Sequence, residues 1–247
     1  MPWKRPSTVP YPKVWHRFQS RDVTISEPSD NHLVEYRVED LTADRFEDAL
    51  RHFTEHFAGD EPLAANRGVV SDPEAMRDHY DFWRWVFDQK MTIVCYKEGS
   101  DEIIGVNLLF VKLASDVKKD VVVRSQSTRD IVEIHGYMMT ERFNVFNLLH
   151  VDQYLNAVGL AINRRYRGLG IATEMLRARI PICREFQIPV TVTDFTAQGS
   201  QRAAEKAGFR TEAEVTYEEL ARIRPNFVFP GIKDKSLKMM SLWVDRK

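Results

Sequence analysis

The segment RRYRGLGIAT, residues 164–173, constrains the fold of this chain more than any other stretch. The apolar run before it, at 154–163, predicts a strand, and the amphipathic pattern after it predicts a helix. N–H groups at a helix start lack internal partners and carry roughly half a positive charge. Glycines let an anion approach that backbone, and arginines add charged donors. The spacing R-x-x-G-x-G therefore favours a phosphate-binding turn, formed by Arg165, Arg167, Gly168 and Gly170.

Two other interpretations of this turn stay open on the pattern alone. A tight turn with solvated arginines would use the same glycines. A dinucleotide-binding turn would need a third glycine where Thr173 stands, together with a carboxylate placed to bind a ribose. The strand before the turn, the helix after it, and a second strand–helix pair ending in AGF at 207–209 favour the phosphate-binding interpretation.

The rest of the pattern predicts a mixed α/β domain on one sheet. Alternating or continuous apolar stretches predict strands, and apolar residues at helical spacing predict helices between them. Thr42 is expected to cap the first helix, which the segment GDEP at 59–62 ends, and Ser71 or Asp72 is expected to cap the second. The expected strands are 32–41, 91–98, 103–113, 154–163, 188–195, 209–219 and 237–244; the later helices are 71–89, 127–141, the stretch after residue 170, and 200–208.

Length, charge and cysteine usage narrow the class of protein. The chain has 247 residues, of which 43% are hydrophobic and 29% charged, and this suits one globular domain. A net charge of -1 gives no global attraction to nucleic acid or to an anionic membrane. Neither a membrane-spanning run nor a signal peptide is expected. The cysteines form no C-x-x-C pair, so we expect neither a disulfide framework nor a cysteine zinc site, and we expect a reducing, cytoplasmic setting. The protein is expected to be a monomer.

Residues 1–30 are expected to form a basic, proline-containing arm ahead of a domain at 31–247. The first 21 residues carry five basic side chains and no acidic one. Four prolines among them oppose the amphipathic helix that a transit peptide needs. The arm is therefore expected to lie extended on the domain or to stay loose.

Four motifs, taken in order, resemble the insect-type arylalkylamine N-acyltransferases of the GNAT acetyltransferase superfamily. They are DEPL at 60–63, FNVF at 143–146, RYRGLGIA at 165–172 and SQRAAEKAGF at 200–209. The resemblance covers the chain from about residue 32 onward. It implies one central, mixed, mostly antiparallel sheet of about seven strands flanked by helices. Two of these strands, around 155–163 and 190–195, would splay apart at the acetyl-CoA site.

The resemblance also implies how acetyl-CoA, as the co-substrate, would bind. The backbone of the turn would close around its pyrophosphate, with arginines as further donors. The preceding strand would pair through its backbone with the pantetheine arm. The residues implied for the turn are Arg165, Arg167, Gly168, Leu169, Gly170, Ile171 and Ala172, and those for the strand are Leu160, Ala161 and Ile162. No metal is implied.

Glu61 is the expected general base. Transfer to an amine needs a base, because an alkylammonium with a pKa near 10 is neutral on the order of 10⁻³ of the time near pH 7. In the resembling family the glutamate of DEPL takes this role. By its position alone, Glu61 would suit a solvated carboxylate at a helix end, and the adjacent Asp60 is a weaker candidate.

Two hydroxyls are expected to assist the leaving thiolate of CoA. The tyrosine that many members of the superfamily use as an acid is replaced by Ala204. The resemblance instead matches two hydroxyl residues four positions apart, Thr196 and Ser200, although the family has serine at the first. Ser200 also suits the cap of the helix at 200–208.

Two further clusters are interpreted as structural. His52 and His56 have the spacing of zinc ligands, but Phe53 replaces the glutamate of H-E-x-x-H and no third ligand stands out. We therefore expect ordinary histidines on the surface of the helix. The aromatic helix at 71–89 places most of its large side chains on one face, which predicts core packing, with one or two lining an amine pocket. That face carries Met76, Tyr80, Trp83 and Phe87.

The sequence thus predicts an N-acetyltransferase that uses acetyl-CoA. The expected acceptor is a small arylalkylamine such as dopamine, tyramine, octopamine or serotonin, which attacks directly in a ternary complex. Three alternatives stay open: agmatine or a polyamine as acceptor, a longer acyl donor, and a CoA-binding module without catalytic activity.

Overall fold

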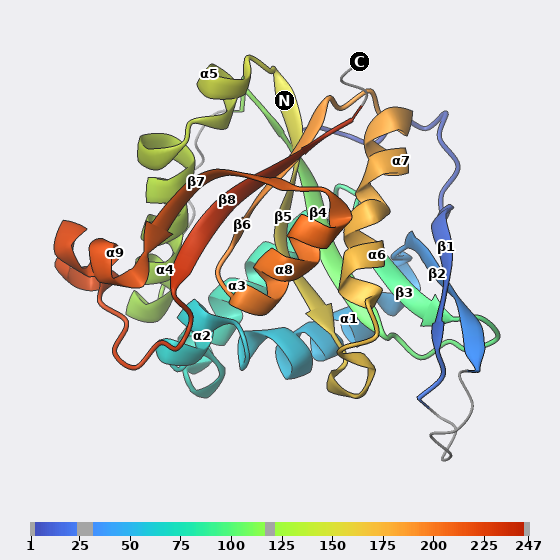
Figure 1. Ribbon diagram of the computed structural model, residues 1–247, viewed down its shortest axis with the longest axis horizontal. Coiled ribbons are helices and arrows are strands. Elements are labelled where there is room, and N and C mark those ends of the chain that lie inside the picture. The colour runs from blue at the N-terminus through green and yellow to red at the C-terminus, as the bar shows by residue number, and fades with distance from the viewer. Residues whose placement is uncertain (1–2, 24–31, 117–121, 245–247) are drawn as a thin grey trace.

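The computed structural model describes residues 3–23, 32–116 and 122–244. Within these ranges the strands form one sheet in the order β1-β2-β3-β4-β5-β6-β8-β7 (Figure 1). Neighbouring strands are antiparallel except β5 and β6, which are parallel. The strands are β1 (Val14–Arg21), β2 (Leu33–Asp40), β3 (Ile93–Lys97), β4 (Gly105–Leu113), β5 (Gln153–Ile162), β6 (Val190–Phe195), β7 (Arg210–Thr216) and β8 (Ser236–Trp243). The mixed, mostly antiparallel sheet is confirmed.

The eighth strand, one more than the expected number of about seven, is β1 from the segment expected as an arm. It pairs with β2 along its whole length. Its start is anchored at the buried Asp40, which accepts hydrogen bonds from Trp15 Nε1 at 2.7 Å and from Arg5 Nη2 at 2.8 Å. Part of the positive charge of this segment therefore neutralises a buried carboxylate, which is the usual way in which such a group is tolerated.

Helices cover both faces of the sheet. The helices that precede β5 pack on one face, together with α9, and α6, α7 and α8 pack on the other (Figure 1). The first group consists of α1 (Phe46–Phe53), α2 (Pro62–Asn66), α3 (Pro73–Phe87), α4 (Gln126–Gly136) and α5 (Val145–Leu149). The others are α6 (Ile171–Arg177), α7 (Arg179–Glu185), α8 (Gln198–Ala207) and α9 (Tyr217–Ile223). We call these the α4 face and the α6 face of the sheet.

Several helix boundaries differ from the expected ones. Thr42 precedes a 3-10 turn, and its side chain makes no capping hydrogen bond. Asp72 caps α3 by accepting from the backbone N–H groups of the first turn, at 3.0 and 3.2 Å. The cap of α8 is Ala197, so the expectation that Ser200 caps this helix is wrong. The short helices α2 and α5 were not expected.

The end of the chain also departs from the expectation of a strand over 209–219. The strand β7 ends at Thr216, and α9 follows at once. Thr216 and Glu219 form a capping box, in which the Thr216 side chain accepts from the Glu219 N–H and the Glu219 carboxylate accepts from the Thr216 N–H. These reciprocal hydrogen bonds favour the start of a helix at this point more strongly than the alternating apolar pattern favours a longer strand.

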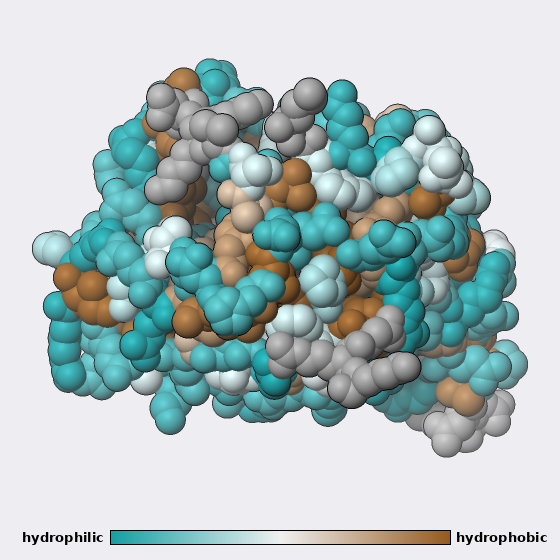
Figure 2. Space-filling view, turned by 90° about the horizontal axis from the view of Figure 1, so that it is seen from above, coloured by the Kyte–Doolittle hydropathy of each residue, from teal (hydrophilic) through white to brown (hydrophobic). Residues whose placement is uncertain are grey.

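The face of the molecule seen from above is largely hydrophilic, and apolar side chains gather in its middle between polar rims (Figure 2). No helix in the described ranges is long and apolar enough to cross a membrane. The free cysteines Cys95 and Cys183 are both buried.

The strands β5 and β6 diverge, and this divergence positions the site. Their ladder contains one register pair, Leu155 with Thr191. Beyond it, the edge of β5 that faces β6 makes no ladder with that strand, although the opposite edge pairs with β4 up to Ile162. A bulge opposite Leu108 and Leu109 bends β5 within this open part. The result is a wedge through the sheet that opens toward the turn at 164–170.

Candidate active site

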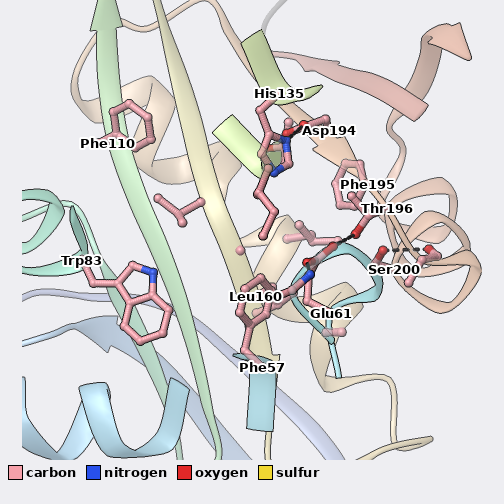
Figure 3. Close-up of a pocket in the computed structure, with 18 of the residues that line it drawn as sticks. Phe57, Glu61, Trp83, Phe110, His135, Leu160, Asp194, Phe195, Thr196 and Ser200 are labelled. Atoms are coloured by element: carbon pink, nitrogen blue, oxygen red, sulfur yellow. Dashed lines mark hydrogen bonds and ion pairs between the residues drawn. The ribbon is translucent and has the colours of Figure 1, made fainter. Parts of the chain in front are cut away.

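One continuous cavity of about 1400 Å³ passes through this wedge. It reaches the turn and α8 on the α6 face of the sheet, and α2, α3 and α4 on the other face. Figure 3 shows the region around the wedge, with Leu160 of β5 near Glu61 and Thr196. Because a cavity open from both faces can admit two different molecules, the wedge can bring their reacting ends together.

Glu61 lies at the start of α2 with its carboxylate held from two sides. It is the cap of this helix, and its Oε2 accepts from the backbone N–H of Ala64 at 2.7 Å. Its Oε1 accepts from Thr196 Oγ1 at 2.6 Å (Figure 3). The structure thus brings together two of the expected catalytic residues, which are 135 positions apart in the sequence. Glu61 thus lies at a helix end, as its position in the sequence suggested, and it caps that helix.

The two expected hydroxyls have different hydrogen-bond partners. The Thr196 hydroxyl donates to Glu61, and the Thr196 backbone carbonyl accepts from the Tyr217 hydroxyl at 2.9 Å. The Ser200 hydroxyl donates to the Ala197 carbonyl at 2.8 Å from the first turn of α8. Both residues line the cavity. Thr196 is therefore placed to orient Glu61, and Ser200 keeps a hydroxyl at the wall of the wedge.

The turn after β5 has the backbone conformation that its glycines predict. Gly168 and Gly170 both have φ of +81°, a region that other residues enter at a cost. Both line the cavity, as do Ile171 and Ala172 at the start of α6. Leu169 faces the second core cluster, and its carbonyl accepts from the Ser20 hydroxyl of β1 at 2.7 Å. The turn is thus fixed by β1 on one side and lines the cavity on the other.

The arginines of the turn differ in their contacts. Arg167 donates to the carbonyls of Ile162 and His56, at 3.1 and 2.8 Å, and to Asp60 at 2.7 Å. Its guanidinium therefore holds the turn against the chain that precedes Glu61. Arg165 is exposed and places its side chain outside this set of contacts.

Asp60 connects the turn to the segment that carries Glu61. It accepts from Arg164 at 2.8 and 3.1 Å in addition to Arg167. The hydrogen bond from Arg164, followed by that from Arg167, holds the pKa of the Asp60 carboxyl below its usual value, although burial opposes the shift. A carboxylate in two ion pairs is a poor base, so Asp60, the weaker candidate for the general base, has a structural role.

The strand residues expected to contact pantetheine lie along the open wedge. Leu160 and Ile162 line the cavity, whereas Ala161 between them is buried in the core of the α4 face. The edge of these residues that faces away from β4 makes no ladder with β6. Backbone groups on such an edge are available to an extended ligand.

Aromatic side chains form the wall of the cavity on the α4 face. Phe57 stacks on Phe53 with ring centres 4.3 Å apart, and Phe53 meets the edge of Trp83 at 4.9 Å. Phe57, Trp83 and Phe110 all line the cavity (Figure 3). The expectation that the aromatic face of α3 is mostly core is confirmed, because Met76, Trp83 and Phe87 are buried there, and Trp83 also reaches the cavity.

A histidine–aspartate pair in the cavity was missed by the sequence reasoning. His135 of α4 hydrogen-bonds through Nδ1 to Asp194 Oδ2 of β6 (Figure 3). Burial opposes a charged imidazole, but the Asp194 carboxylate outweighs it and raises the pKa of His135 above its ordinary value. One available signal was the single charged residue in the strand VTVTDF. Its partner is 59 positions away, and no local pattern marks that residue.

The second histidine pair is buried, and the expectation that it lies on the helix surface is wrong. The rings of His52 and His56 lie 4.7 Å apart and both residues are buried. Burial, and then the neighbouring His56, lower the pKa of His52 to about 4. Among the residues that the structure describes, no group of three or more histidine, cysteine or acidic side chains is arranged to hold a metal.

Comparisons with known proteins agree with this geometry. The acetyltransferase (GNAT) domain model matches residues 49–210. The crystal structure of the protein assigned as arylalkylamine N-acetyltransferase 7 of the yellow fever mosquito Aedes aegypti is 45% identical, with a TM-score of 0.92, over 98% of this chain and 100% of that one. Arylalkylamine N-acetyltransferase 2 of Aedes aegypti is 21% identical, with a TM-score of 0.75, over 85% and 99%. A polyamine N-acetyltransferase of Drosophila melanogaster shares the fold at 15% identity, with a TM-score of 0.69, over 85% and 100%. No curated protein matches the chain.

The chain belongs to the GNAT acetyltransferases, since the domain model covers most of it and the sheet, the wedge and the glycine turn occupy the expected places. Within this class it is an amine N-acetyltransferase similar to the insect arylalkylamine N-acetyltransferases. GNAT enzymes use acetyl-CoA and bind small amines as acceptors.

Proposed function

We propose that this protein transfers an acetyl group from acetyl-CoA to the primary amine of a small arylalkylamine, with Glu61 as the general base. The observation that carries the proposal is the single cavity that joins the glycine turn, Glu61 and an aromatic wall. The acyl donor would enter from the α6 face, along the turn and the open edge of β5. The amine would enter from the α4 face, among the aromatic side chains.

Glu61 suits proton removal because two hydrogen bonds fix the orientation of its carboxylate and still leave lone pairs free to accept a proton. Each carboxylate oxygen can accept about two hydrogen bonds, and each accepts one, from Thr196 and from Ala64. One lone pair per oxygen is left for an ammonium group or a water that relays its proton. The fixed carboxylate would therefore deprotonate the acceptor next to the wedge.

The residues around the wedge fit the acyl donor. The positive φ angles of Gly168 and Gly170 present successive backbone N–H groups to a pyrophosphate at the start of α6. The open edge of β5 at Leu160, Ala161 and Ile162 offers backbone groups to the pantetheine amides. Ser200 can turn its hydroxyl from the Ala197 carbonyl toward the leaving sulfur. No tyrosine competes for that sulfur, because Ala204 stands where many superfamily members have the tyrosine.

The aromatic wall favours an arylalkylamine over agmatine or a polyamine. Rings can stack on the face or edge of Phe57, Trp83 and Phe110. Aliphatic polycations need several free carboxylates, and of those that line the cavity Asp60, Asp78 and Asp81 are engaged by arginines and Asp194 by His135. The assay described next also distinguishes this proposal from the use of a longer acyl donor and from a CoA-binding module without catalytic activity.

The test is release of free CoA thiol from acetyl-CoA in the presence of tyramine, dopamine, serotonin, agmatine or spermidine, repeated with longer acyl-CoAs. Glu61→Gln keeps the size of the side chain and should lower kcat by roughly 10²–10⁴, the usual weight of one acid–base group. Glu55→Gln is the matched control, since Glu55 is exposed on the neighbouring turn and should act like wild type. Wild-type turnover by Glu61→Gln would remove Glu61 as the base, and no turnover with any amine would leave a CoA-binding module.

A further inference from the structure

A group of polar side chains lies in the cavity and has no part in the chemistry described so far. It consists of His135 on α4, Asp194 on β6 and Lys112 on β4, which all line the cavity. Figure 3 shows His135 and Asp194 together, apart from Glu61 and Thr196. Glu61 lines the same cavity, so both groups face the space that an acceptor would occupy. We call this group the polar end of the cavity.

The alternation of side chains along the strands places the polar end on the side of the acceptor. Thr193 points to the α6 face, where its hydroxyl accepts from the buried Arg179 of α7 at 2.8 Å. Asp194, the next residue of β6, therefore points to the α4 face. Lys112 has the same parity on β4 as Phe110, which packs in the core of the α4 face. The acyl donor, on the α6 face, would not contact the polar end.

The polar end offers hydrogen-bond donors to the cavity. The Asp194 carboxylate is engaged by His135 Nδ1, and His135 Nε2 makes no hydrogen bond with any described residue. The Lys112 ammonium has a weak contact, 3.8 Å to the sulfur of Met139, and no carboxylate within 4.0 Å in the described part of the chain. Burial lowers the pKa of Lys112, while Asp194 and Asp116 oppose this. A half-buried ammonium with so poor a partner gains from an oxygen ligand.

We propose that His135 and Lys112 form a subsite for an oxygen at the far end of the acceptor, so that ring-hydroxylated arylalkylamines are preferred. This inference rests on the proposed function and adds the substrate class. With its amine at Glu61 and its ring along Phe57 and Trp83, the acceptor would place a ring hydroxyl against the two donors. Asp194 is a positioning residue, which fixes the His135 ring through the hydrogen bond to Nδ1 and so turns Nε2 toward the cavity.

The same subsite disfavours a second cation. A guanidinium or a distal ammonium has only donors, and it would face the N–H groups of Lys112 and His135. Of the two carboxylates near these donors, Asp194 already binds His135, and Asp116 is exposed and accepts from the backbone N–H of Leu113. Agmatine and polyamines should therefore be poor acceptors even though related folds serve them.

The experiment compares tyramine with phenethylamine, which differ by one ring hydroxyl. The ratio of their kcat/KM values should be about tenfold or more in favour of tyramine in the wild type, the weight of a hydrogen bond to a charged donor. Lys112→Met and His135→Phe should each bring this ratio toward one, and Lys112→Met should raise the relative rate with agmatine. Lys238→Met is the matched control, because Lys238 pairs with Glu205 away from the cavity, and it should keep the wild-type ratio.

Three results would overturn the subsite. One is a wild-type ratio near one in an active enzyme, which leaves the proposed function standing. Another is a fall in kcat/KM for both amines by the same factor in Lys112→Met and His135→Phe, which would place these residues in the chemistry or the fold. Lys112→Met, which keeps the length of the side chain, decides the matter if His135→Phe does not fold. Absence of turnover with every amine would remove the proposed function and this subsite together.

Discussion

The approach of Phe57 to the bulged part of β5 leads to a prediction for Gly159→Ala. A Cβ built on Gly159 would lie 2.5 Å from Cε2 and Cζ of Phe57 and 3.0 Å from Cζ of Phe53. Real Cβ atoms do not approach carbon so closely, so a ring must move. The φ angle of Gly159 is not positive, and the cost is therefore steric and not conformational.

The magnitude follows from how far the rings can retreat. Phe53 is fully buried, stacks on Phe57 at 4.3 Å and packs on Trp83, so it cannot yield. Phe57 lines the cavity and can move only into it. Overpacking of this kind costs about 1–3 kcal/mol. The displaced ring should also narrow the cavity beside the aromatic wall, and this would raise KM for the amine more than KM for acetyl-CoA.

Gly136→Ala is the matched control, with the opposite expected sign. Gly136 ends α4 in helical conformation, φ -57° and ψ -48°, and no atom lies within 4 Å of its added Cβ. Alanine should stabilise the protein there by about 0.5–1 kcal/mol. Thermal unfolding should shift by roughly 2–4 °C per kcal/mol in a protein of this size, downward for Gly159→Ala and upward for Gly136→Ala. A Gly159→Ala variant as stable as the wild type would refute the reasoning.

Three further predictions concern the donor side of the cavity. Gly170→Ala meets no atom within 4 Å but must keep φ at +81°, so it should cost about 1–2 kcal/mol and raise KM for acetyl-CoA far more than KM for the amine. Ser200→Ala should lower kcat in steady-state assays and leave CoA binding by calorimetry intact; unchanged kcat would remove the hydroxyl from the mechanism. Asp60→Asn should destabilise by about 1 kcal/mol or less, because the pair is partly exposed. Since the pKa of Asp60 is lowered by Arg164 and Arg167, that stability is present above about pH 4 and lost as pH falls through the lowered pKa; urea melts of both proteins should then converge at low pH.

The turn and its neighbours could be predicted from the sequence because their signals are local. Glycines that need positive φ, arginines beside them, and the change from a strand pattern to a helix pattern all lie within 20 residues of Gly168. The start of α9 carried an equally local signal, since Thr216 and Glu219 have the spacing of a capping box. The alternating pattern of β7, in contrast, predicts a strand that runs past Thr216.

Other features depend on contacts between distant segments, and no local pattern reveals them. Prolines and basic residues predict an arm, yet β1 joins the sheet because Asp40 gives Arg5 and Trp15 a buried partner. The partners of Asp60 are about 100 positions away. His135 and Asp194 each look ordinary until α4 and β6 are packed together.

The parallel pair β5–β6 explains why one cavity can serve two substrates. A parallel pair needs a crossover, and α6 and α7 provide it on one face of the sheet. The turn that starts the crossover therefore lies at the open end of the wedge, on the α6 face, and the first helices are left to cover the other face. Thr196 comes directly after β6 and meets Glu61 across the wedge, so the proposed base lies where the two faces of the sheet meet. Successive side chains of β6 point to opposite faces of the sheet, so Thr193 lies on the proposed donor side and Asp194 on the proposed acceptor side. Changes at the polar end should therefore alter the choice of amine and not the affinity for acetyl-CoA.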